Sequence, residues 1–239
     1  MEVYYMHKDE VKVSNATLCV LIQSCNFQIV TLLFAIISIF FNIQYMNTTL
    51  WILFIIGFLL NSIILVVYLV SIFSKKISNS IINLIVKIMK KLKVKNIEEK
   101  EENIKKELES YQNSAKYIKE NKYVALKTLL TTVFQIFFLY SVTYFVYCSF
   151  GLFEHNILRI VSMQAVIYTS TSGIPLPGAV GVSEGNFVKM FKNLFIQDIV
   201  TSAVLISRGV SFYLLILISG LLVLFNIIFK KTKTKNEDI

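Results

Sequence analysis

Helix-breaking residues and charges are scarce in this sequence of 239 residues. It has two prolines, Pro175 and Pro177, and only 16% of its residues are charged, while 55% are hydrophobic. This balance excludes a water-soluble domain of such length, because soluble domains carry about 25% charged residues. The shortage of breakers also lets long apolar runs satisfy their own backbone hydrogen bonds as helices, as hydrocarbon requires. We therefore predict an all-α polytopic membrane protein, since the alternation of an outer-membrane barrel is missing.

Cysteine and histidine, which build disulfide frameworks and many metal sites, are also rare. Cys19, Cys25 and Cys148 are odd in number, lie in apolar runs and show no CxxC spacing, and the chain has only two histidines. This pattern favours cysteines that pack over disulfides or zinc ligands. Outside the apolar runs the sequence shows no Gly-rich nucleotide loop, metal cluster or nucleophile triad. We accordingly predict no metal, no cofactor and no catalytic residue.

Apolar runs and lysine clusters divide the chain into parts. Runs such as 48–73 and 210–229 approach or exceed the roughly 20 residues that cross a bilayer. Between Lys75 and Lys127 lie fourteen lysines and seven acidic residues, and basic loops remain in the cytoplasm. We expect a multi-pass protein of the plasma membrane with the following parts: a cytoplasmic segment 1–15, a transmembrane hairpin 16–73, a basic cytoplasmic loop 74–123, a transmembrane bundle 124–229 with an even number of crossings, and a cytoplasmic tail 230–239.

The net charge of +9 points to lipid rather than nucleic acid, because the lysines flank apolar runs. Within the basic loop, residues 77–94 place apolar side chains along one helical stripe, which favours a helix lying on the inner leaflet. A plain solvated helix is the alternative, and alternating Glu and Lys favour it for residues 96–122. Anionic or aminoacylated phospholipid is the expected partner, and the sequence leaves open both an oligomer and a separate lipid-modifying enzyme as partner.

Both prolines and four of the eight glycines fall between residues 173 and 185. Proline and glycine free backbone polar groups, and lipid tolerates these only where protein or a wet cavity surrounds them. The stretch therefore predicts a re-entrant loop or broken helix near 172–186, in which backbone N–H groups approach an anionic group. The residues of this loop that we assign to a lipid-headgroup site are Gly173, Pro175, Pro177, Gly178 and Gly181.

Two charged residues complete the predicted site. Glu184 directly follows the glycine-rich loop, and Arg208 lies in the next apolar run. A charge inside the bilayer is costly and by default marks a functional position. Arg208 is one of only two arginines, against twenty-two lysines, and its fork-shaped guanidinium suits a phosphate or a carboxylate. The plainer alternative is that Glu184 and Arg208 pair only to steady a kinked helix.

The run Pro175-Leu-Pro-Gly-Ala-Val-Gly-Val-Ser-Glu-Gly-Asn-Phe187, followed by Arg208, resembles the carboxyl-terminal signature of the lysylphosphatidylglycerol synthase transmembrane, flippase-like family. The family pattern reads roughly P-x-P-G-G-x-G-x-x-E, and here Ala179 replaces the second paired glycine. The opening 2–9 also resembles a family segment that follows an earlier intramembrane loop. On this resemblance the chain corresponds to about the last two-thirds of a member, and a truncated frame is expected.

The resemblance implies a function in moving aminoacylated or glycosylated phospholipids, such as lysylphosphatidylglycerol, between leaflets. It also links the chain to phosphatidylglycerol lysyltransferases and antibiotic resistance, because some members are fused to a soluble domain that transfers lysine from its tRNA. Two alternatives remain at this stage. One is an enzyme or subunit acting on lipid-linked substrates with Glu184 as a general base, and the other is a non-functional fragment.

Overall fold

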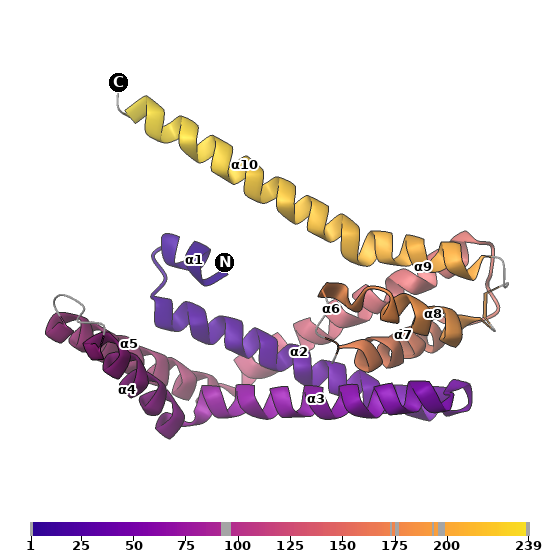
Figure 1. Cartoon of the computed structure of the whole chain (residues 1–239), viewed down its shortest axis with the longest axis horizontal. Coiled ribbons are helices and arrows are strands. Elements are labelled where there is room, and N and C mark those ends of the chain that lie inside the picture. The colour runs from indigo at the N-terminus through magenta and orange to yellow at the C-terminus, as the bar shows by residue number, and fades with distance from the viewer. Residues whose placement is uncertain are drawn as a thin grey trace. The chain divides into compact units, whose positions relative to one another are not determined.

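The computed structural model of the chain describes residues 2–91, 97–172, 174, 177–192, 194–195 and 199–237 (Figure 1). Regular structure in these ranges is entirely helical, which confirms the predicted all-α class. In chain order the elements are α1 (Glu2–Lys8), α2 (Val13–Asn42), a 3-10 turn (Ile43–Tyr45), α3 (Thr48–Phe73), α4 (Lys75–Lys91), α5 (Ile97–Glu120), α6 (Lys122–Ser149), α7 (Ile157–Thr171), a 3-10 turn (Pro177–Ala179), α8 (Val182–Phe191), α9 (Val200–Arg208), a π-helical turn (Gly209–Tyr213) and α10 (Leu214–Glu237).

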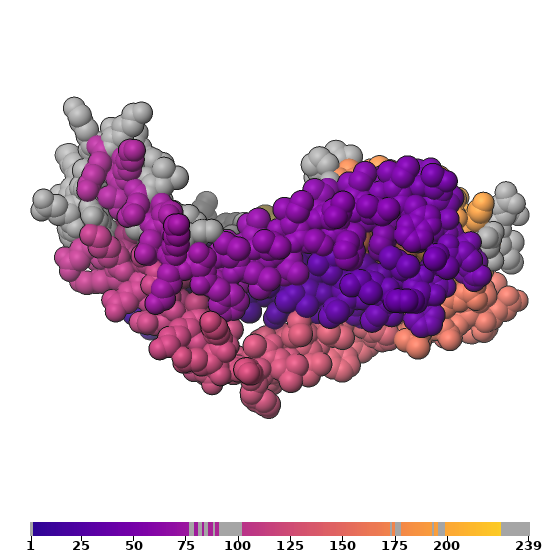
Figure 2. Space-filling model, turned by 90° about the horizontal axis from the view of Figure 1, so that it is seen from below, coloured from indigo at the N-terminus to yellow at the C-terminus, as the bar shows by residue number. Residues whose placement is uncertain are grey.

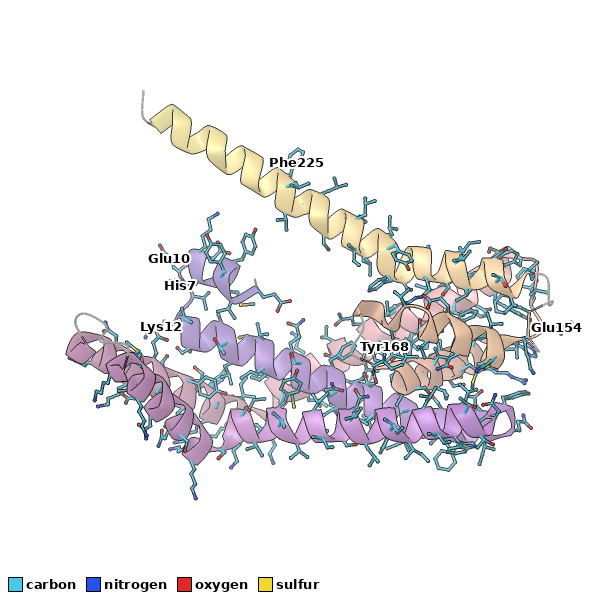
Figure 3. All side chains as sticks on the ribbon, in the orientation of Figure 1. His7, Glu10, Lys12, Glu154, Tyr168 and Phe225 are labelled. Atoms are coloured by element: carbon cyan, nitrogen blue, oxygen red, sulfur yellow. The ribbon has the colours of Figure 1, made fainter. Side chains whose placement is uncertain are left out.

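Within the described residues, four helical stretches are long and apolar enough to cross a bilayer. They cover Val13–Tyr45, Thr48–Phe73, Lys122–Ser149 and Val200–Phe225, and they make the chain a multi-pass membrane protein. Their outer faces carry exposed apolar side chains, as a lipid-facing helix should. Figure 2 shows α3 uncovered on the face turned to the viewer, and Figure 3 shows Phe225 projecting from α10.

The chain divides into two compact units. Unit 1 comprises Met1–Phe34 and Phe58–Ile136, and unit 2 comprises Ala35–Gly57 and Phe137–Ile239. Each unit therefore combines segments that lie far apart in the sequence, because the long helices α2, α3 and α6 each contribute to both. The boundaries of the cytoplasmic and membrane parts named above remain predictions.

Polar contacts attach α5 to the start of α2 in unit 1. The Glu107 carboxylate accepts the backbone N–H of Ser14 at 3.0 Å, and Ser114 donates to the Asn15 side chain at 2.9 Å. A free N–H in the first helical turn needs such an acceptor, and a carboxylate there also matches the positive end of the helix dipole. The same unit contains a small hydrophobic core, formed by Leu18, Cys25, Ile72 and Ala115.

The predicted amphipathic stretch 77–94 coincides with α4 up to Lys91. Residues 92–94 and most side chains of its apolar stripe lie outside the described part of the chain. Contact between this helix and the inner leaflet therefore remains a prediction.

Unit 2 is organised around α7, which is short and largely buried. Asn156 caps its first turn by accepting the N–H of Arg159 at 2.9 Å. Gly57 of α3 lies directly against the Thr169 backbone carbonyl of α7, where a Cβ atom would overlap. A glycine at this position lets two apolar helices approach closely, as small residues do in membrane proteins.

Candidate functional site

Two short helices, α7 and α8, lie side by side and flank the glycine-rich loop (Figure 1). α7 has 15 residues and α8 has 10. At about 1.5 Å per residue they are roughly 22 and 15 Å long, whereas the hydrocarbon is about 30 Å thick. Neither helix crosses alone, and the backbone between them leaves the helical conformation at Gly178. The break predicted near 172–186 is therefore present, and its depth in the bilayer remains a prediction.

The backbone of this loop takes left-handed conformations. Gly178 and Gly181 have φ of 66° and 88°, and Ala179 has φ of 48°. Glycine adopts such angles freely, but for alanine the left-handed region costs roughly 1 kcal/mol or more. The alanine in place of the second paired glycine therefore sits in a strained conformation. Of the other predicted loop residues, Pro177 begins a 3-10 turn, while Gly173 and Pro175 lie outside the described part of the chain.

Glu184 holds two parts of the site together. One carboxylate oxygen accepts the backbone N–H of Gly181, the N-cap of α8. The other oxygen accepts from Arg208 Nε at 3.0 Å. Both side chains are largely shielded, with 22% of Glu184 and 19% of Arg208 exposed. The two charged residues predicted for the site are thus brought together as an ion pair that also caps a helix.

Arg208 contacts two further groups from the end of α9. Its Nη2 donates to the Gly178 carbonyl, and its guanidinium stacks over the Phe212 ring at 5.0 Å. Phe212 in turn lies 2.6 Å from the position that a Gly178 Cβ would occupy. An arginine has five N–H donors, and Nη1 has no partner among the described residues. The guanidinium is therefore held in one orientation while part of its donor edge stays available.

The helix is locally widened directly after Arg208. A π-helical turn covers Gly209–Tyr213, and Ser211 donates to the Ser207 carbonyl at 2.7 Å. A π turn inserts one extra residue and re-aims the neighbouring side chains, and it occurs often at functional sites. Here it lies between Arg208 and the helix α10 that completes the last span.

Arg208 lines a cavity of about 380 Å³ within unit 2. Tyr168, which is labelled on α7 in Figure 3, lines this cavity. Its ring centroid lies 5.7 Å from that of Tyr140. Hydroxyl and amide groups surround a single guanidinium in this cavity, a combination suited to an anionic group with several acceptor oxygens. The residues lining the cavity are Leu139, Tyr140, Thr143, Gln164, Tyr168, Thr171, Ser172, Ile174, Gly178, Ala179, Arg208, Ser211 and Phe212.

Thr143 forms hydrogen bonds with residues of two other helices that surround this cavity. Its hydroxyl donates to the Gln164 side chain at 3.2 Å and lies 2.9 Å from the Ser207 hydroxyl. Because a hydroxyl has one proton, Thr143 accepts from Ser207 while it donates to Gln164. The contacts join α6, α7 and α9 around the site.

The sequence prediction named Glu184 and Arg208, which the structure pairs, but it did not name Thr143, Gln164 or Tyr168, which line the same cavity as Arg208. Thr143 and Gln164 are polar residues inside apolar runs, which is a usable signal at membrane depth. This signal does not distinguish Thr143 from other threonines, because threonine in a membrane helix also donates to its own helix backbone. Thr131 and Thr132 do so here.

Comparison with known proteins identifies the family of the chain. Residues 1–219 match the family model described as the lysylphosphatidylglycerol synthase TM region. Searches of curated proteins and of solved structures returned no match. The matched region contains all four helical stretches in whole or in large part, together with the loop, Glu184 and Arg208. The chain therefore belongs to the lysylphosphatidylglycerol synthase transmembrane-region family.

Proposed function

We propose that the chain handles phospholipid headgroups and acts as a flippase-like domain for phosphatidylglycerol, its lysyl derivative or a similar lipid. The observation that carries the proposal is the guanidinium of Arg208, held by Glu184 at the wall of a polar cavity. A lipid phosphodiester would bind the available Nη1 edge and the surrounding hydroxyls, and its acyl chains would remain in lipid.

The length of α9 supports a position inside the bilayer. Arg208 lies eight residues after Val200, the first residue of the last span. At about 1.5 Å per residue this is roughly 12 Å along the helix, which is well inside a hydrocarbon layer of about 30 Å. We propose that the α7–α8 hairpin enters from the extracellular side and that its loop meets Arg208 near the same depth.

Glu184 would control how tightly the headgroup is held. Paired with Arg208, it leaves the empty cavity without net charge, which lowers the cost of placing an arginine in the bilayer. When a phosphodiester enters, it competes with the carboxylate for the guanidinium. A transport site must bind well enough to admit its cargo and weakly enough to release it, and this competition would limit affinity.

No step of this proposal requires nucleotide hydrolysis. Moving a cationic headgroup outward against an inside-negative potential costs about 2.3 kcal/mol per charge per 100 mV. Continued synthesis of the lipid on the inner leaflet would supply that work as a concentration gradient.

A scrambling assay tests the proposal. The full chain is reconstituted in liposomes containing fluorescent phosphatidylglycerol, and dithionite is added outside to quench the outer leaflet. We expect the inner-leaflet fluorescence to be lost with wild-type protein and retained in protein-free liposomes. Arg208→Gln should behave like protein-free liposomes. Arg159→Gln is the matched control, because Arg159 contacts Tyr45 at the other end of α7 and does not line the cavity. Wild-type liposomes that lose fluorescence no faster than protein-free ones would refute the proposal.

A further inference from the structure

A second polar cavity, of about 200 Å³, lies within unit 1 between α2, α3 and α6. It shares no residue with the Arg208 cavity. The residues lining it are Gln23, Ser24, Phe27, Gln28, Tyr68, Thr132 and Gln135.

The glutamines of this cavity lie within two of the helical stretches that are long and apolar enough to cross a bilayer. Gln23 and Gln28 are ten and fifteen residues after Val13, where the first span begins. At about 1.5 Å per residue these positions are roughly 15 and 22 Å along the helix. An amide in hydrocarbon is costly unless it is hydrogen-bonded. Glutamines from α2 and α6 that meet at one cavity therefore indicate a site that holds a polar occupant.

One acceptor in the cavity is unsatisfied. Gln28 Oε1 is shielded from the surroundings and has no hydrogen-bond partner among the described residues. Two residues earlier on α2, Asn26 donates to Thr128 at 3.1 Å and so joins α2 to α6. Thr132 donates to the Thr128 carbonyl at 3.0 Å, which leaves the Thr132 oxygen able to accept. An occupant that both donates and accepts hydrogen bonds would complete these groups.

The lining selects an uncharged occupant. Its polar groups are amides and hydroxyls, and it contains no lysine, arginine, histidine or carboxylate. A phosphate or ammonium group would enter without an opposite charge, which is costly away from water. Phe27 and Tyr68 add aromatic faces on which C–H groups can pack. Gln23 and Gln135 are exposed, so an occupant can enter the cavity past their side chains.

The volume sets the size of the occupant. At roughly 30 Å³ per water molecule, 200 Å³ holds about six or seven non-hydrogen groups. We infer that this cavity binds a glycerol-sized polyol group, supplied either as a free solute or as the terminal group of a lipid. The site is separate from the Arg208 cavity, so this inference and the proposed function can be refuted independently of each other.

Side-chain amide NMR tests the inference. The full chain, labelled with ¹⁵N-glutamine, is placed in phosphatidylcholine nanodiscs. Three probes are added in turn: free glycerol, phosphatidylglycerol, and phosphatidylmethanol, which has the same phosphodiester charge but no free hydroxyl. Gln23, Gln28 and Gln135 report the new site, Gln164 reports the Arg208 cavity, and Gln44 in the turn after α2 reports neither.

We expect glycerol, phosphatidylglycerol or both to shift the signals of Gln23, Gln28 and Gln135. A shift with glycerol identifies a free polyol as a source, and a shift with phosphatidylglycerol alone identifies a lipid headgroup. Phosphatidylmethanol should leave these three signals in place, even where it shifts Gln164. Equal shifts with phosphatidylmethanol, or none with either hydroxylated probe, would overturn the inference. The inference would also be overturned if these signals shifted, without any probe, between nanodiscs that hold one chain and nanodiscs that hold two. Such a shift would identify a second chain as the occupant of the cavity.

A matched pair of variants completes the test. Gln28→Leu removes the unsatisfied acceptor at similar volume and should weaken the hydroxylated probe about fivefold, the effect of losing one hydrogen bond. Gln44→Leu should change nothing. An unchanged signal of Gln112, which lies on α5 in the same unit as Gln28, would show that Gln28→Leu is folded. Unchanged affinity in that folded variant would contradict the assignment.

Discussion

Arg208 Nε and Glu184 Oε1 lie 3.0 Å apart, and the same carboxylate caps the first turn of α8 through the Gly181 N–H. The pair therefore has a structural part and a part open to ligand. The plainer view, in which the pair only steadies a kink, accounts for the first part. It leaves unexplained why the guanidinium also lines a cavity surrounded by hydroxyls.

Glu184→Gln separates these two views. Glutamine retains an oxygen that can accept the Gly181 N–H but removes the charge that competes for Arg208. We expect the variant to remain folded, to bind anionic phospholipid about tenfold more tightly and to scramble it more slowly. The reason is that the Arg208 guanidinium, no longer paired with a carboxylate, binds the lipid phosphate more strongly. Lipid retention in native mass spectrometry and the dithionite assay measure the two quantities. Weaker binding in a folded variant would favour the purely structural view.

Ala179→Gly should stabilise the loop. The alanine has φ of 48°, in a region that glycine adopts without strain. Relief of this strain should raise the free energy of unfolding by about 1 kcal/mol, partly offset by the greater freedom of glycine in the unfolded chain. The midpoint of thermal unfolding in detergent measures the change. Gly178→Ala is the opposite variant, since it adds strain at φ of 66° and presses on Phe212, and it should lower the midpoint.

Gly57→Ala should loosen the contact between α3 and α7. Its Cβ would overlap the Thr169 carbonyl, a backbone atom that cannot turn aside. Overpacking of this kind costs roughly 1–3 kcal/mol. Gly220→Ala is the matched control, because no atom lies within 4 Å of its added Cβ. Thermal unfolding of both variants should show a loss for Gly57→Ala alone, and equal midpoints would mean that the helices can shift apart at no cost.

Acidification should release α5 from the start of α2. Hydrogen bonding to Ser14 lowers the pKa of Glu107 below its ordinary value of 4.5, and the nearby charges of Lys12 and His7 act in the same direction. A carboxyl whose pKa is lowered by folding stabilises the folded state above its unfolded pKa, and that contribution is lost as the pH falls through the folded pKa. The Ser14 amide signal in NMR should therefore titrate below pH 4.5. In Glu107→Gln this titration should vanish, and a midpoint above 4.5 would contradict the assignment.

The sequence predicted the features that depend on local pattern. Length and apolarity identified the membrane-crossing runs, and the concentration of proline and glycine identified the break between α7 and α8. The partners of these elements depend on three-dimensional packing instead. The contact of Gly57 with Thr169, over a hundred residues away, leaves no local trace, because a glycine inside an apolar run is equally compatible with a helix that packs against nothing.

The two polar cavities illustrate the same distinction. Gln23 and Gln28 visibly interrupt the first apolar run, yet their shared cavity with Gln135 appears only when α2 and α6 are placed together. The π-helical turn after Arg208 is equally invisible in the sequence, since Gly209–Tyr213 continues the apolar run of the last span. Its extra residue changes the direction of side chains without changing hydropathy.

Cysteine labelling tests the topology proposed for the loop. In a background with the three native cysteines replaced by serine, Ser172→Cys and Val180→Cys introduce thiols at two exposed positions of the loop. Phe153→Cys marks the segment before α7, and Lys116→Cys marks the basic loop. We expect Phe153→Cys to react with an impermeant maleimide from outside and Lys116→Cys only after permeabilisation.

The two loop cysteines should behave differently from both markers. A loop near the depth of Arg208 is screened from a bulky maleimide but admits a small methanethiosulfonate through the polar cavity, so slow reaction from the outer side is expected. Phosphatidylglycerol should slow that reaction further by occupying the cavity. Reaction with maleimide as fast as that of Phe153→Cys would place the loop in water. An arginine and a carboxylate in water carry no desolvation cost, so their pairing would not indicate a binding site. The proposal that the loop and Arg208 bind a lipid headgroup inside the bilayer would then have no physical basis.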